Sequence, residues 1–227
     1  MNKTPMKKAA LYGISSLVIS MLTYAALILV ALYVPENLLL HRGPDAGSLE
    51  TWMPPHSDLP EKMVYIRESM ADNQDIAANY ENPDEMVAKL DNTFERIEGY
   101  LRRYVSANRC RDYGARHILL NITSHPSDVG AKRYFEFVKE RDIQEGWQVH
   151  EIAVGENAFT GLTTESSLCL DTETEFAMKL TFIKRSYMVT ISMSALKGTN
   201  QPEDMLPIIL RLAQGFDDRL PSAAANP

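Results

Sequence analysis

Histidines are the side chains of this sequence best suited to proton transfer or metal binding near neutral pH. There are five, and they are scattered along the chain: His41, His56, His117, His125 and His150. His41 and His56 fall in a linker-like segment, where a solvated histidine is the default. His117 and His150 lie on predicted strands, and they face each other only if those strands are neighbours in the right register. Because a metal site needs further convergent ligands, we expect structural histidines and no metal ion.

An acidic run, Asp171-Thr172-Glu173-Thr174-Glu175, carries carboxylates at alternate positions, as a calcium-binding loop does. It lacks the glycine of such a loop and its distal bidentate glutamate. We interpret the run as a solvated loop, with weak cation binding as the alternative. The sequence also lacks the GxSxG, HExxH, phosphate-binding and dinucleotide-binding motifs. We therefore predict no catalytic residue, no cofactor and a domain that is not an enzyme.

The two cysteines, Cys110 and Cys169, are candidates for a disulfide bond. Both fall in the part of the chain that we place outside the cytoplasm, where disulfides persist. A bond between them would close a loop of about 60 residues and contribute roughly 4 kcal/mol in the chain-entropy model. Two free thiols are the alternative, and two cysteines alone do not decide between these states.

Residues 9–34 contain no charged side chain. As a helix this segment would be roughly 39 Å long, which is enough to cross a hydrocarbon core of about 30 Å with some tilt. Lysines precede the segment and Glu36 is the first charge after it, so the positive-inside bias puts residues 1–8 in the cytoplasm. A cleaved signal peptide is the alternative, but its apolar core is usually about 7–15 residues long. We predict one transmembrane helix in a cell membrane, with the rest of the chain outside the cytoplasm.

Beyond this helix we expect a linker over residues 35–57, a globular domain over 58–220 and a disordered tail over 221–227. All 30 acidic residues and 20 of the 23 basic residues follow the apolar segment, so the outer part carries a net charge of about −10. That charge argues against nucleic acid as a partner, since nucleic acid needs a basic footprint. It also argues against broad docking on anionic lipid. The expected partner is a protein or a small molecule.

Apolar periodicity and turn residues predict alternating strands and helices in the domain. Strands are expected at 63–70, 100–105, 115–124, 147–154, 158–163, 176–183 and 187–195. Helices are expected at 72–80, from Pro83, after Ser127 and over the last part of the domain. The last helix carries apolar residues on one face, namely Met205, Ile208, Ile209, Leu212 and Phe216. Strands meeting in hairpins with helices gathered on one side describe an α+β domain, an antiparallel sheet packed with helices.

Residues 95–105 support two predictions. Apolar residues recur at helical spacing here, which would extend the helix that begins at Pro83 past residue 102; they are Met86, Leu90, Phe94, Ile97 and Leu101. A glycine at position 99 and the tyrosines and valine of residues 100–105 favour a strand instead. The sequence leaves both open.

Several local strings have a family resemblance. They are Asp58-Leu59-Pro60, Gly99-Tyr100, Val154-Gly155-Glu156, the hairpin Phe182-Ile183-Lys184-Arg185-Ser186-Tyr187-Met188-Val189, and Leu212-Ala213 with Asp218-Arg219-Leu220. Over roughly residues 57–220, they resemble uncharacterised bacterial membrane-anchored or lipoprotein domains similar to the PsbP-like α/β/α sandwich. The resemblance implies that fold and a bacterial accessory domain that binds rather than catalyses. It brings no catalytic residues, and Glu156 and Ser186 stand where the family has Asp and Gly.

Three functions remain open at this point. The leading one is a membrane-tethered, non-enzymatic domain that binds or stabilises another membrane or extracytoplasmic protein. A receptor for a small ligand is the second, with a cleft between sheet and helices near Trp147 or Tyr187. An enzyme of unrecognised type is the third, and it requires clustered titratable groups in a cleft.

Overall fold

The computed structural model describes residues 49–107, 114–166, 174–198 and 200–221. All of them belong to one unit of the chain, Arg42–Pro227. The predicted cytoplasmic segment 1–8, the predicted transmembrane helix, the first part of the linker, Cys110, Cys169 and nearly all of the tail lie outside the described residues. Within the described ranges, no helix is both long and apolar enough to cross a membrane.

The domain is built on one antiparallel sheet of seven strands in the order β1-β2-β3-β7-β6-β5-β4. The strands are β1 (Met63–Ala71), β2 (Glu98–Ser106), β3 (Ala115–Ser124), β4 (Gln148–Ile152), β5 (Asn157–Ser166), β6 (Thr174–Lys184) and β7 (Tyr187–Leu196). Two runs of antiparallel strands that follow one another in the sequence, β1-β2-β3 and β4-β5-β6-β7, meet at the β3–β7 pair. Two helices, Asn73–Ala77 and Pro83–Asn92, lie in the connection from β1 to β2. The chain passes from β3 to the far edge through a helix, so β1 and β4 are the two edge strands.

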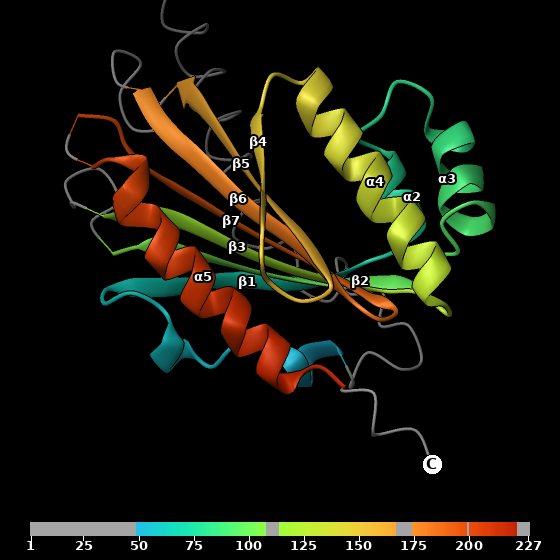
Figure 1. Ribbon diagram of the computed structural model, residues 1–227, viewed down its shortest axis with the longest axis horizontal. Coiled ribbons are helices and arrows are strands. Elements are labelled where there is room, and N and C mark those ends of the chain that lie inside the picture. Colours follow the sequence, from blue (N-terminus) through green and yellow to red (C-terminus); the bar gives the residue numbers. More distant parts are fainter. Residues whose placement is uncertain (1–48, 108–113, 167–173, 199, 222–227) are drawn as a thin grey trace, which may run out of the picture. The chain divides into compact units, whose positions relative to one another are not determined.

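In the described part of the chain, four α-helices accompany the sheet: α2 (Asn73–Ala77), α3 (Pro83–Asn92), α4 (Asp128–Gln144) and α5 (Pro202–Arg219). Two 3-10 turns, η2 (Leu49–Trp52) and η3 (His56–Asp58), precede β1. In Figure 1 the strands pass between α5 on one side and α4 on the other. The α+β class predicted from the sequence is confirmed.

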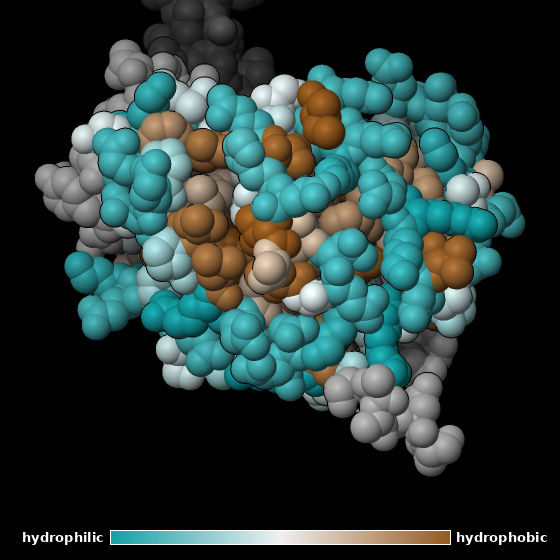
Figure 2. Space-filling view, in the orientation of Figure 1, coloured by the Kyte–Doolittle hydropathy of each residue, from teal (hydrophilic) through white to brown (hydrophobic). Residues whose placement is uncertain are grey.

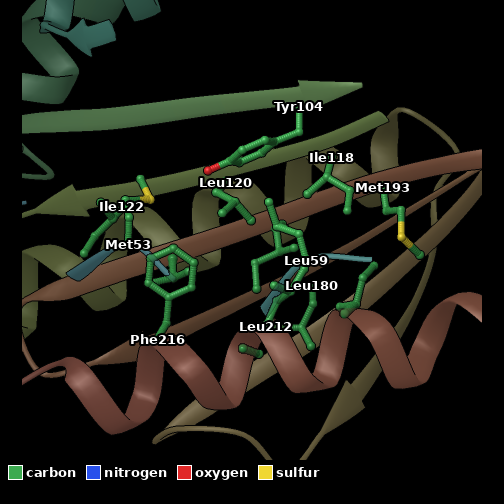
Figure 3. Packing of buried hydrophobic residues seen from close by; sticks show 14 of the residues in the cluster. Met53, Leu59, Tyr104, Ile118, Leu120, Ile122, Leu180, Met193, Leu212 and Phe216 are labelled. Atoms are coloured by element: carbon green, nitrogen blue, oxygen red, sulfur yellow. The ribbon is translucent and has the colours of Figure 1, made fainter. Parts of the chain in front are cut away.

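Alternation along β6 explains why helices cover both faces of the sheet. Met178, Leu180 and Phe182 belong to the apolar cluster that includes the buried side of α5. The next residue, Ile183, belongs to a second cluster with α3 and α4. Successive side chains of a strand point to opposite faces of the sheet. A strand whose side chains are apolar on both faces therefore needs a helical layer over each face. Figure 3 shows Leu212 and Phe216 pointing from α5 toward the sheet.

The second helical layer packs through aromatic and aliphatic side chains. Tyr134, Phe135 and Val138 of α4 are buried with Leu90 of α3 and Phe159 of β5. Phe135 and Phe159 meet edge-on, with their ring centroids 5.3 Å apart.

The prediction that the helices gather on one side of the sheet is wrong, because α5 and α4 pack on opposite faces. Helix periodicity indicates which face of a helix is buried, but not which face of the sheet that helix covers. Kinship with the PsbP-like sandwich stays a prediction.

Residues 95–105 are a turn followed by a strand. Helix α3 ends at Asn92, and Glu95 has a φ of 53°, which no α-helix contains. The Arg96 N–H donates to the Leu90 carbonyl at 2.9 Å and closes the helix end. Ile97 is 58% exposed, so it does not continue the buried face of α3. The prediction of a strand in this region is confirmed. The helical spacing of apolar residues runs from α3 into β2 by chance, because the two elements are separate.

Glycines at positive φ give a first testable prediction. At Gly155 (φ 57°) an added Cβ would lie 2.6 Å from the Ile183 carbonyl oxygen, whereas at Gly146 (φ 87°) nothing lies within 4 Å. Both alanine variants meet the left-handed penalty, about 1 kcal/mol each. Gly155→Ala should lower the free energy of unfolding by a further 1–3 kcal/mol or so through overpacking. Urea denaturation of both variants measures the difference, and equal losses would contradict the stated geometry.

Candidate interaction surface

The histidines and acids singled out in the sequence do not form a site in the described part of the chain. His117 on β3 and His150 on β4 are separated by β7, β6 and β5, so they do not face each other. His56 packs near Tyr104, with ring centroids 5.9 Å apart. His41 and residues 171–173 lie outside the described residues, and among those described no group of His, Cys, Asp and Glu is arranged to hold a metal ion.

Glu175 corrects the interpretation of the acidic run as a solvated loop. It lies in β6 and its side chain is 2% exposed. Arg116 Nη1 donates to its Oε1 at 3.1 Å, and the Ser194 hydroxyl donates to its Oε2 at 2.8 Å. Buried charges require such partners, so this glutamate is a structural group.

Lys179, Asp142 and Trp147 form the cluster closest in type to a catalytic site. Lys179 is 6% exposed and its Nζ lies 2.5 Å from Asp142 Oδ1, while Asp142 is fully buried. The ammonium also lies 4.0 Å from the centroid of the Trp147 ring. Burial lowers the pKa of Lys179, and the Asp142 carboxylate opposes that shift. Gly161 leaves room for the pair, since a Cβ there would lie 3.1 Å from Trp147 Cε3.

The geometry of this cluster is that of a sealed structural pair. Lys179 is on β6 and Asp142 is on α4, so their contact joins the helix to the sheet. Trp147, near which a ligand cleft was expected, covers the lysine instead. The cluster therefore holds two layers of the fold together.

Removing one partner of this pair gives a second prediction. Lys179→Met leaves the buried Asp142 carboxylate without its closest cation and should cost about 3–5 kcal/mol of stability. The double variant Lys179→Met/Asp142→Leu removes both charges and should recover most of that loss. Urea denaturation of the three proteins tests the coupling. If the double variant were as unstable as Lys179→Met alone, the loss in the single variant would not come from an unpaired Asp142 carboxylate, and the prediction would be wrong.

His125 precedes α4 and is buried, with 4% of its surface exposed. Its Nδ1 lies 2.8 Å from the Phe94 carbonyl oxygen and its Nε2 has no partner. Nδ1 therefore carries the proton and donates, and the ring is neutral. Burial lowers the pKa of His125 to about 4, and the nearby Arg96 adds to the shift.

Because the pKa of His125 is lowered in the folded protein, the free energy of unfolding should decrease as the pH falls. Between pH 6.5 and 4 the unfolded histidine binds a proton and the folded one does not, so stability falls as pH falls through this window. We expect the wild type to lose about 2 kcal/mol more than His125→Gln between pH 6.5 and 5. Thermal or urea unfolding of both proteins across this range measures it, and parallel pH profiles would refute the assignment.

A groove of about 440 Å³ lies between α3 and α4. Its lining includes Phe94 and Phe137, and the Lys89 ammonium lies 4.8 Å from the Phe137 ring centroid. Lys132, Arg133, Glu136 and Glu140 line it as well, so its charges are mixed. Neither Trp147 nor Tyr187 lines this groove, which lies between helices and not between helix and sheet.

Apolar side chains are most exposed on β1, the outermost strand at one edge of the sheet. Val64 is 45% exposed, Tyr65 47% and Ile66 49%. In the described part of the chain, the other large hydrophobic side chains exposed to this degree are Ile97, Val129 and Ile143, which are isolated in the sequence. Successive side chains of a strand point to opposite faces, so Tyr65, opposite Tyr104, lies on the α5 side of the sheet and Val64, opposite Val105, lies on the other side. The edge strand is therefore apolar on both of its sides, and exposed apolar surface of this kind marks interaction sites.

Two arginines lie on the same side of this edge as Val64. The register of β1 and β2 shifts between Tyr65 and Arg67, so Ile66 is bulged, and Arg67 lies directly opposite Arg103. Both arginines are exposed, and neither forms a salt bridge with another residue that the structure describes. We call Val64, Tyr65, Ile66, Arg67 and Arg103 the β1–β2 surface. The sequence alone does not reveal this surface, because only the strand order shows that β1 is an edge strand.

A second apolar area is visible in Figure 2, over α5 and β4. The partly buried apolar residues of these two elements that pack against the core include Leu206 and Leu210 of α5 and Ile152 of β4. None of them is among the exposed large hydrophobic side chains. The β1–β2 surface is therefore the stronger candidate site.

The chain matches no protein-family model and no curated protein. Among solved structures it is similar to the extracellular domain of PknH from Mycobacterium tuberculosis, with a TM-score of 0.45 and 7% sequence identity. The match covers 75% of this chain and 95% of that one. A likeness of this size supports no conclusion about the function of this chain.

Proposed function

We propose that the domain is a non-enzymatic binding module, held outside the cytoplasm by one membrane helix, that binds a protein through the β1–β2 surface. The observation that supports it is the exposure of Val64, Tyr65 and Ile66, each close to half exposed, on an edge strand beside Arg67 and Arg103. Protein interfaces are enriched in aromatic residues and arginine, and tyrosine and arginine are frequent among the residues that carry binding energy.

The titratable groups of the core support binding rather than catalysis. Lys179 is bound to Asp142 beneath Trp147, and Arg116 is bound to Glu175. A catalytic acid or base must reach a substrate. These groups are instead engaged with each other between the layers of the fold.

The groove between α3 and α4 favours a second candidate, a receptor for a small ligand. Its volume and its two phenylalanines suit an apolar molecule, and its lysines and arginine suit an anionic group. Native mass spectrometry of protein purified from its own cells tests this. A small molecule retained by the wild type and lost from Phe137→Lys would support the receptor, and a ligand-free wild type would count against it.

Loss of a co-purifying protein on mutation tests the leading proposal. The full-length chain is expressed at its native level and extracted in mild detergent. Tyr65→Ser/Ile66→Ser should reduce the co-purifying partner at least tenfold, because replacing interface anchors of this kind costs about 2 kcal/mol or more each. Ile143→Ser is the matched control, since Ile143 is 55% exposed on α4, far from β1 in the sequence. A lone monomer, or equal losses in the two variants, would contradict the proposal.

A further inference from the structure

Arg67 and Arg103 place two positive charges directly opposite each other on neighbouring strands. Like charges at opposed positions are unfavourable in a sheet, by roughly 0.2–1 kcal/mol. Neither arginine has a carboxylate within salt-bridge distance in the described part of the chain. Fold stability alone does not account for this arrangement.

The opposite face of the same two strands shows the arrangement that stability favours. Glu68 of β1 lies opposite Arg102 of β2, and Arg102 Nε donates to Glu68 Oε2 at 3.1 Å. Glu50 lies 3.5 Å from the same guanidinium. A complementary pair thus occupies one face, while one residue away in each strand the pair is arginine with arginine.

Apolar residues surround the two arginines on their own sheet face. Val105 lies two residues after Arg103 on β2 and is opposite Val64 of β1. On the other side of β2, Leu119 of β3 lies opposite Arg103. Val105 and Leu119 are partly exposed. Exposed guanidinium groups can bind a carboxylate through charge-assisted hydrogen bonds, and apolar side chains beside them give the rest of a partner segment a surface to pack on.

We propose that the partner binds through an acidic segment whose carboxylates contact Arg67 and Arg103, with apolar side chains against Val64, Val105 and Leu119. The inference rests on the proposed function and names the chemistry of its partner. A protein segment fits better than a lipid surface or a nucleic acid, because it can present carboxylates and apolar side chains together, matching the two arginines and the apolar residues of this face.

Charge reversal at one arginine separates this role from a structural one. Arg67→Glu creates a complementary pair with Arg103, so the melting temperature should equal or exceed that of the wild type by up to a few degrees. Retention of the partner by the full-length protein should nevertheless fall at least tenfold. A variant that melts normally and keeps its partner would overturn the inference.

Zero-length crosslinking tests the carboxylate directly. Arg67→Lys/Arg103→Lys keeps both charges and introduces amines, which a carbodiimide joins to a carboxylate in contact. In native membranes we expect amide crosslinks from positions 67 and 103 to Asp or Glu of a second protein, mapped by mass spectrometry. Arg211→Lys, an exposed site on α5, is the matched control. Equal crosslinking at the control site would overturn the inference.

Two outcomes distinguish failure of this inference from failure of the proposed function. A partner that depends on Tyr65 and Ile66 but not on either arginine would leave the proposed function standing and refute the acidic segment. Absence of any partner would refute both. Binding of the purified protein to phosphatidylglycerol vesicles, but not to phosphatidylcholine vesicles, with loss in Arg67→Glu would assign the arginines to lipid and also refute the inference.

Discussion

Strands β6 and β7 are buried on both faces, one under α5 and the other under α4. A strand pair of this kind needs two helical layers, since each unpaired apolar face would otherwise remain in water. Two helices cannot cover seven strands evenly. The cover is therefore thickest over the middle of the sheet, and β1 keeps apolar side chains in solvent at one edge.

Polar groups inside the domain act within this constraint. Asp142 and Lys179 bond α4 to β6, and Arg116 and Glu175 bond β3 to β6 across β7. Each is a charged pair that breaks at a cost of several kcal/mol when one member is lost. The first pair holds α4 over β6, and the second ties β6 to β3. These buried charged groups are thus bound to each other between the elements of the fold.

Local elements followed from the sequence where one physical signal dominated. The hairpin of β6 and β7 and the apolar face of α5 were predictable, because alternation and helical spacing were unbroken. Position in the sheet was not, since no local signal separates an edge strand from a central one. His117 and His150 were left open for that reason, and three strands divide them. Glu175 was placed in a solvated loop because its partner Arg116 is distant in sequence. The candidate site was missed for the same cause.

The central claim is that the edge formed by β1 and β2 is where the domain binds. Hydrogen–deuterium exchange of the full-length protein, with and without its co-purified partner, tests this most directly because bound backbone amides exchange more slowly. The account predicts added protection in peptides covering residues 63–71 and 98–106, with no change over α5. Protection confined to α3 and α4, or no difference at β1, would contradict it.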